Sequence, residues 1–293
     1  MYVTYWNLRE QPFPVAAVDK QIYMTESHQE GLAKLYYLID QRRVAGVLTG
    51  PDGSGKTLML KLLLQRAVKA HHPVHFLDMF SDGTLAFVHQ VLRILGVPDP
   101  DHTTTLPEAL QTLQAHCRQG EASLPTTLLL IDNAQHLETA EDACLIHALC
   151  NLRNRASQPV FTLVLAGTED IRASLMQYES VRCWIQFDWQ LLSLTPGQTL
   201  EYVQHHIRAV GGDIWAFTEG ALNLVHTCTQ GIPLSINNLC DTALMLGFVT
   251  QVPNVTEEII LQAAKETGLE LPAQQGDAGD TETSQLSSPH ERF

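Results

Sequence analysis

The chain has 293 residues, 45% of them hydrophobic, which is enough for one large α/β core with a smaller module beside it. It has no apolar run of about 18 residues and no basic, apolar leader, so we expect a cytoplasmic protein with no membrane span of its own. The net charge of −14 disfavours nucleic-acid binding, which would need a local basic patch. The six cysteines lack C-x-x-C spacing and are expected to be buried free thiols.

The first 30 residues are irregular and rich in aromatic side chains, among them Tyr5, Trp6 and Phe13. A helix is expected from about Gln29 to Asp40. Two interpretations of the aromatic segment are open. Its rings either contact the base of a bound nucleotide, as segments before a phosphate-binding loop often do, or simply cover the core.

Residues 50–57 read GPDGSGKT and fit the phosphate-loop pattern of Gly, four residues, Gly-Lys-Thr. An apolar strand over 44–49 precedes the loop and a helical pattern over 58–69 follows it. Glycines let the backbone turn around phosphate oxygens, while Lys56 would reach the β- and γ-phosphates and Thr57 would hold Mg²⁺. The predicted nucleotide-binding residues are Gly50, Pro51, Asp52, Gly53, Ser54, Gly55, Lys56, Thr57 and Leu58.

Each of the next two expected strands ends in polar side chains. Residues 74–77 are expected to form a strand that ends at Asp78, and the apolar run 126–131 is closed by Asp132 and Asn133. The ends of parallel strands face the ligand in doubly wound sheets. Asp132 is therefore predicted to bind the Mg²⁺ water shell, since burying a carboxylate without a partner is costly.

A further buried strand is expected over 160–166, with Gly167 and Thr168 at its end. Thr168 either contacts the γ-phosphate or the attacking water, or is a plain turn residue. Five strands and interleaved helices predict an α/β fold, a five-stranded and mostly parallel sheet sandwiched by helices. The remaining elements of this region are expected helices at 84–95, 106–118, 138–156 and 171–177 and an extended stretch at 184–194.

From Pro196 onward the pattern is helical, with expected helices at 199–210, 218–229, 233–250 and 256–267, so this part is predicted to be a helical lid. From Pro272 the composition is polar and aperiodic, which predicts disorder. The expected organisation is an N-terminal segment packed on the core (1–30), a nucleotide-binding domain (31–195), a lid (196–268) and a disordered acidic tail (269–293).

Several short motifs accompany the phosphate loop. They are Tyr5-Trp6-x-Leu8 with Pro12-Phe13, Ser27-His28, Leu165-Ala166-Gly167-Thr168-Glu169, and Gly231-Ile232-Pro233 followed by Ile236 to Asp241. With these motifs, residues 2–268 resemble the AAA+ ATPases, and more narrowly the ExeA/GspA group linked to type II secretion. The resemblance implies an ATP- and Mg²⁺-binding, ring-forming motor or assembly factor.

The chain departs from this family at three catalytic positions. Asn133 stands where the family has a Glu that polarises water, which would remove general-base help worth roughly 10²- to 10⁴-fold. Trp184 stands where the resemblance implies an arginine finger, whose contribution is roughly 10³- to 10⁵-fold in GTPases, and only Arg182 is close by. Leu234 replaces an Arg of the lid. The residues that decide hydrolysis are therefore expected to be Asn133, Asp78, Thr168 and Arg182.

Three functions follow from these departures. The first is a hydrolysis-deficient, ATP-gated assembly factor or scaffold that meets a protein partner of a secretion or pilus system. The second is an active motor in which Asp78 or Glu138 supplies the carboxylate and Arg182 reaches a neighbouring subunit in a ring. The third, a DNA-transposition regulator, is least favoured by the acidic composition.

Overall fold

A computed structural model describes residues 1–14, 19–79, 83–119 and 126–269. Its centre is a sheet in which every pair of neighbouring strands is parallel, in the order β2-β3-β4-β1-β5. The strands are β1 (Ala45–Thr49), β2 (Val74–Asp78), β3 (Thr127–Asp132), β4 (Phe161–Gly167) and β5 (Ile185–Gln190). The predicted α/β fold with a five-stranded parallel sheet is confirmed.

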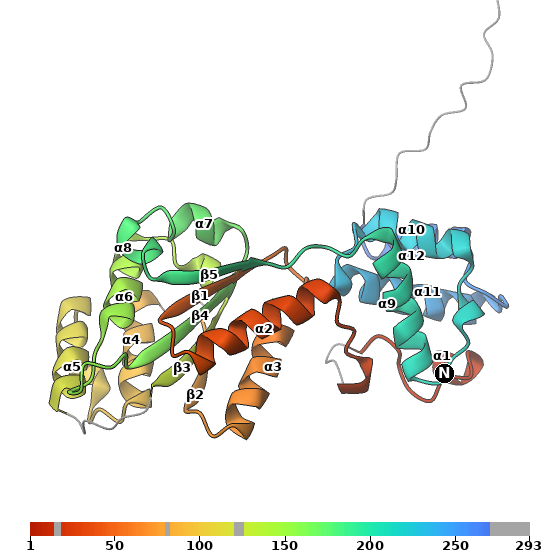
Figure 1. Ribbon diagram of the computed structural model, residues 1–293. Coiled ribbons are helices and arrows are strands. Elements are labelled where there is room, and N and C mark those ends of the chain that lie inside the picture. Colours follow the sequence, from red (N-terminus) through yellow and green to blue (C-terminus); the bar gives the residue numbers. More distant parts are fainter. Residues whose placement is uncertain (15–18, 80–82, 120–125, 270–293) are drawn as a thin grey trace, which may run out of the picture.

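Helices cover both faces of the sheet (Figure 1). One face packs against α2 (Glu26–Asp40) and α3 (Lys56–Lys69). The other face packs against α4 (Gly83–Ile94), α5 (Leu106–Gln119), α6 (Ala140–Asn151), α7 (Asp170–Ser174) and α8 (Glu179–Arg182). This explains why β1, β3 and β4 are mostly apolar on both faces: every residue of these strands is buried.

The strand register brings the functional positions to one edge of the sheet. Asp78 pairs with Asp132, and Thr49, which precedes the phosphate loop, pairs with Gly167. Parallel strands end at the same edge, so the carboxyl ends of β1, β2, β3 and β4 lie side by side.

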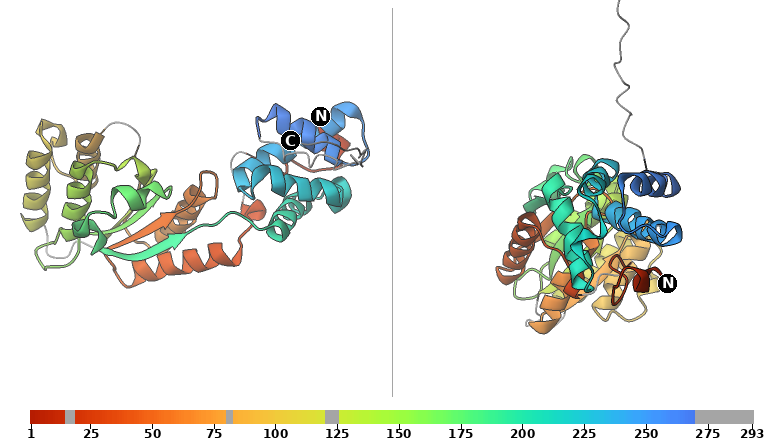
Figure 2. Two further views of the ribbon diagram at one scale, coloured as in Figure 1. Left: turned by 90° about the horizontal axis from the view of Figure 1, so that it is seen from above. Right: turned by 90° about the vertical axis from the view of Figure 1, so that its right-hand side faces the viewer.

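A second unit of helices lies beyond this edge (Figures 1 and 2). It consists of α9 (Pro196–Ala209), α10 (Glu219–Thr229), α11 (Pro233–Thr250) and α12 (Glu257–Glu266), which share one buried apolar cluster. Helix α9 begins with a capping box between Thr195 and Gln198 and has Pro196 in its first turn. Along the described ranges, no helix combines the length and the apolar character that crossing a bilayer requires.

The N-terminal segment packs against this lid. Its short helix α1 (Tyr2–Tyr5) contacts α11, and Trp6, Leu8 and Phe13 belong to the buried cluster of the lid. The Trp6 indole Nε1 donates to the Leu244 carbonyl at 2.9 Å. These rings up to Phe13 therefore pack on the lid and not on the sheet domain, where the N-terminal segment was expected, because the lid helices leave an apolar surface that they cover.

Several element boundaries differ from the expected ones. The helix expected over 138–156 ends at Asn151, since the chain then forms a turn closed by a bridge between Arg153 and Pro159. The helix α8 was not expected. Two of the six free thiols, Cys144 and Cys183, are exposed, which corrects the expectation that all are buried. Residues 270–293, most of the expected disordered tail, lie outside the described residues.

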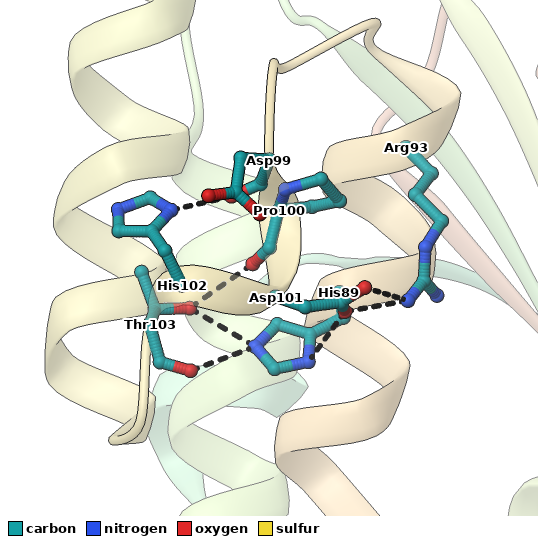
Figure 3. A network of polar contacts seen from close by, with 7 residues as sticks. All are labelled: His89, Arg93, Asp99, Pro100, Asp101, His102 and Thr103. Atoms are coloured by element: carbon teal, nitrogen blue, oxygen red, sulfur yellow. Dashed lines mark hydrogen bonds and ion pairs between the residues drawn. The ribbon is translucent and has the colours of Figure 1, made fainter.

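The connection between α4 and α5 is held by polar contacts (Figure 3). Arg93 Nη2 donates to Asp101 Oδ2 at 2.7 Å and holds the pKa of that carboxyl below its usual range. His89 lies between Asp101 and Thr103, with its Nε2 3.0 Å from the Thr103 hydroxyl. The short 3₁₀ turn over Pro100–His102 is thereby fixed against α4.

Replacing Trp6 with Ala is expected to destabilise the lid by about 3 to 5 kcal/mol, because it removes a buried indole and leaves the Leu244 carbonyl without its donor. Urea unfolding measures the loss. Trp215→Ala is the matched control, since Trp215 is 71% exposed and its removal should change stability by less than about 0.5 kcal/mol. Equal losses in the two variants would contradict the anchoring role.

Candidate nucleotide-binding site

The phosphate loop connects β1 to α3 and needs glycine at two positions. Gly53 and Gly55 have φ of 79° and 103°, a region that residues with a Cβ rarely adopt. Gly53 is also closely approached by the lid, because a Cβ at this position would lie 2.6 Å from the Leu234 Cβ. The loop conformation therefore depends on glycine both for its backbone and for its contact with the lid.

Lys56 is buried beneath the loop. Its ammonium donates to the carbonyls of Gly50 and Pro51 at 2.9 and 3.0 Å and lies 3.5 Å from the exposed carboxylate of Asp52. Burial lowers the pKa of Lys56, and the nearby carboxylates of Asp52 and Asp132 oppose that shift. A buried cation stabilised mainly by neutral carbonyls favours an incoming anion.

Thr57 and Asp132 are in direct contact. The Thr57 hydroxyl donates to Asp132 Oδ2 at 2.6 Å, and Asp132 Oδ1 accepts from the backbone amide of Asn133 at 3.1 Å. Asp132 is only 3% exposed. The two side chains predicted from the sequence to hold Mg²⁺ therefore lie together, with a hydroxyl and a carboxylate, both oxygen ligands that suit this ion.

Asn133 adopts a left-handed backbone conformation with φ of 54°, which Asn tolerates better than most residues. Its side-chain Nδ2 donates to Asp78 Oδ1 at 2.7 Å. The structure thus joins two of the four residues expected to decide hydrolysis, one at the end of β2 and one directly after β3. An amide and a carboxylate stand side by side at the carboxyl edge of the sheet.

The loop also fits a phosphate group. The Ser54 hydroxyl is buried and has no hydrogen-bond partner among the described residues. The loop leads directly into the N-terminus of α3, where backbone amides have no helical partner and the helix dipole favours an anion. The free hydroxyl, the buried ammonium and the helix N-terminus together suit a polyphosphate.

A cavity of about 500 Å³ lies between the loop and the lid. Lys56, Thr57, Asp132 and Asn133 line it, as the sequence motifs predict for a nucleotide site. Its other walls come from the N-terminal segment and from the lid. Leu234 was expected near the site from the family resemblance, and Tyr23 belongs to the aromatic segment that was expected either to contact the base or to cover the core. Gln21, Tyr202 and His206 also line the cavity, and no sequence motif marked them, because they meet only when the lid folds against the loop.

The first turn of α11 touches the phosphate loop. The Leu234 amide donates to the Gly53 carbonyl at 3.2 Å, and Pro233, Leu234 and Asn237 line the cavity. The apolar side chain of Leu234 occupies the position where the family resemblance implies an arginine. This part of the lid therefore brings no cation to the cavity.

Thr168 and Arg182 are not among the residues that line the cavity. The Thr168 hydroxyl donates to Asp170 Oδ2 at 2.7 Å in the turn before α7. Arg182 lies on the exposed surface of α8. Trp184, at the expected finger position, packs against its own sheet domain, with its Nε1 3.4 Å from His147 Nδ1 and the Arg153 guanidinium over its ring.

Known proteins share this architecture. Residues 39–175 match a family model described as an AAA domain. The fold resembles Cdc6p from Pyrobaculum aerophilum, with a TM-score of 0.68, 16% identity, and coverage of 87% of this chain and 70% of that one. It also resembles the Thermotoga maritima RuvB branch migration motor, with a TM-score of 0.56, 18% identity, and coverage of 88% and 73%. Residues 39–175 thus resemble an AAA domain in sequence, and the chain has the AAA+ fold.

A relative extends the likeness over most of the chain. General secretion pathway protein A of Aeromonas hydrophila is 27% identical over 270 residues, which are 91% of this chain and 48% of that protein. The chain is a distant homologue of this protein and spans about half its length. The resemblance inferred from the sequence motifs is confirmed.

Stability is expected to fall as the pH drops from about 6.5 to about 4, because burial lowers the pKa of His206 to about 4. In this window the unfolded chain binds a proton that the folded one does not, so the free energy of unfolding decreases by up to about 3 kcal/mol. Urea unfolding at several pH values measures the slope. His206→Gln should flatten it, and His72→Gln, which replaces an exposed histidine, should not.

Proposed function

We propose that this protein binds ATP with Mg²⁺ and uses the bound nucleotide mainly as a structural signal. The buried ammonium of Lys56 carries this proposal, since a triphosphate would supply the anion that the loop carbonyls cannot. The AAA domain implies nucleotide binding, and the structure of an AAA+ neighbour, the Aeropyrum pernix ORC2 protein, is of its ADPNP-ADP complexes. Thr57 and Asp132 would hold Mg²⁺, which neutralises phosphate charge when bound.

Hydrolysis is proposed to be slow because three charges are missing. Asn133 cannot accept a proton from water, Trp184 is packed within its own subunit, and Leu234 brings no cation from the lid. The general base and the arginine finger that Asn133 and Trp184 replace would act mainly in the transition state and not on the bound nucleotide. Binding can therefore persist without turnover.

The proposed role is that of a nucleotide-gated assembly factor or scaffold. The distant relative is a general secretion pathway protein, which favours a protein partner in a secretion or pilus system. Self-association into a ring is a further proposal, which the internal packing of Trp184 weakens. A DNA partner, such as the one bound by the structurally similar Drosophila ORC, is less favoured here by the net charge of −14.

A second candidate, an active ATPase, is supported by the contact between Asn133 and Asp78. The Asn133 amide donates to one carboxylate oxygen of Asp78, which leaves the other oxygen available. Asp78 lies at the carboxyl edge of the sheet, beside Asp132 in register. In this candidate Asp78 is the general base and Asn133 positions it.

Lys56→Ala is expected to weaken ATP binding in the presence of Mg²⁺ by about 10- to 100-fold, since it removes a charge-assisted contact worth roughly 1.5 to 3 kcal/mol. Isothermal titration calorimetry measures the affinity. Lys69→Ala, at the far end of the same helix, is the matched control and should bind like wild type. A wild-type protein that binds neither ATP nor ADP would overturn the proposed function.

Asn133→Glu is expected to raise ATP turnover by at least about 10²-fold over a near-background wild type, because it restores a general base. Asn133→Gln is the matched control, which lengthens the side chain without adding a carboxylate and should leave turnover low. Steady-state phosphate release provides the readout. Substantial wild-type turnover that Asp78→Asn abolishes would instead establish the second candidate.

A further inference from the structure

The sheet has a basic edge on the side opposite the phosphate loop, although the chain as a whole is acidic. Every pair of neighbouring strands is parallel, so the segments that lead into the strands lie at this amino-terminal edge. Figure 1 shows α2, which leads into β1, running from the lid side to the far end of the sheet. A charge pattern in these segments is therefore also a pattern in space.

Four of these entry segments, those before β1, β2, β4 and β5, are fully described. Taken from the last two residues of the preceding helix, they are residues 39–44, 68–73, 150–160 and 181–184. They contain one acid, Asp40, and the following six cations: Arg42, Arg43, Lys69, Arg153, Arg155 and Arg182. In a chain with 32 Asp and Glu against 18 Lys and Arg, this is the reverse of the average composition.

Five of the six cations are exposed, and none of the five forms an ion pair with another described residue. By contrast, Lys34, Arg93 and Arg172, elsewhere on the sheet domain, each pair with a carboxylate. Arg153 is the exception among the six, since its Nη1 donates to two carbonyls at the end of α6. We call the five exposed cations the basic edge: Arg42, Arg43, Lys69, Arg155 and Arg182.

The strand register brings these cations together across the width of the sheet. Ala45 at the start of β1 pairs with Leu163 in β4 and with Ile185 in β5. The Thr162 hydroxyl donates to the Arg43 carbonyl at 2.7 Å, which joins the beginnings of β1 and β4 directly. Strands lie about 4.8 Å apart, so five strands spread the cations over about 20 Å. This spacing suits an extended anionic surface better than one small anion.

Helix dipoles explain only part of this arrangement. Lys69 and Arg182 lie in the last turns of α3 and α8, where the negative end of the helix dipole stabilises a cation. Arg43 and Arg155 lie in connections beyond the helix ends, where that effect falls off. The exposed charges of these connections point instead to a partner that carries negative charge.

Two exposed apolar side chains lie in the last turns of helices that end at the same edge. Tyr37 of α2 is 48% exposed and Val68 of α3 is 57% exposed. Tyrosine and aliphatic side chains beside cations are typical of protein surfaces that contact the interface of a bilayer. Nucleic acids favour aromatic rings that can stack on bases, and the ring of Trp184 at this edge is half-buried against α6. The combination favours a lipid surface over a nucleic acid.

We propose that the basic edge, together with Tyr37 and Val68, docks this protein on a membrane surface of anionic phospholipids. Attraction of this kind is worth about fivefold in affinity for each cation near the surface. The phosphate loop lies at the opposite edge of the sheet, so the nucleotide site would face away from the bilayer. The inference goes beyond the proposed nucleotide binding and does not depend on it.

The test measures binding of the full chain to vesicles by co-sedimentation. Vesicles of equal parts phosphatidylglycerol and phosphatidylcholine are compared with vesicles of phosphatidylcholine alone, in about 0.1 M salt. The wild type is expected to bind the anionic vesicles at least about tenfold more strongly. Raising the salt to about 0.5 M should remove most of this difference, because it screens the cations.

Arg43→Gln combined with Arg155→Gln is expected to weaken binding to the anionic vesicles by about 10- to 30-fold, because it removes two cations of the basic edge. Arg208→Gln combined with Lys265→Gln is the matched control, since both side chains are exposed on the lid, and it should bind like wild type. Val68→Ser should weaken binding by about threefold, because it removes exposed apolar surface.

Equal affinities of the wild type for the two kinds of vesicle, or equal losses in the two double variants, would overturn the inference. Binding to a DNA duplex that exceeds binding to the anionic vesicles, and that the first double variant loses, would overturn it in favour of a nucleic-acid surface. Lys56→Ala should bind the vesicles like wild type, since Lys56 is buried at the opposite edge. ATP binding measured on the same samples tests the proposed function separately, so either proposal can fail without the other.

Discussion

The buried ammonium of Lys56 is the constraint on which the site depends. It is held by two loop carbonyls, and those carbonyls point at it only because glycines give the loop its backbone conformation. The loop in turn needs β1 between β4 and β5, where the register sets Thr49 beside Gly167, at the same edge of the sheet as Asp132 and Asp78. Sheet, loop and helix α3 thus converge on one buried cation, which two neutral carbonyls and the exposed carboxylate of Asp52 hold.

The same edge of the sheet carries groups suited to binding a nucleotide, and under the proposed function it lacks groups that would hydrolyse one. Thr57 and Asp132 keep a contact suited to a metal–phosphate complex, whereas Asn133 gives an amide to Asp78 where a second carboxylate would repel it. The left-handed backbone conformation at Asn133 also favours asparagine at this position, because asparagine tolerates that conformation better than most residues. The proposal that ATP is bound but hydrolysed slowly therefore rests on the geometry at the ends of β2 and β3.

Local patterns predicted the sheet domain well, because glycine spacing and continuous apolar runs report directly on the loop and on strands buried from both sides. They predicted Lys56, Thr57 and Asp132 for the same reason. They did not predict that Trp6 would pack under α11, or that Gln21 and His206 would share a cavity wall. These contacts join residues more than 180 positions apart and leave no periodic signal in either segment. The family resemblance predicted that Asn133 lies in the site. Its hydrogen bond to Asp78 could not be predicted in this way, because it depends on the register between β2 and β3.

The chain crosses between the two units twice, once between Phe13 in the lid cluster and α2 on the sheet, and once between β5 and α9 (Figure 1). A body tethered by a single connection can swivel freely about it, whereas two separated connections leave essentially one axis of rotation. A rotation of the lid relative to the sheet would therefore have to bend both connections and break the contact between Leu234 and Gly53. Force applied to the lid by a bound partner would act first on β5 and α2, which pack beside β1 and α3, the two elements that the phosphate loop connects.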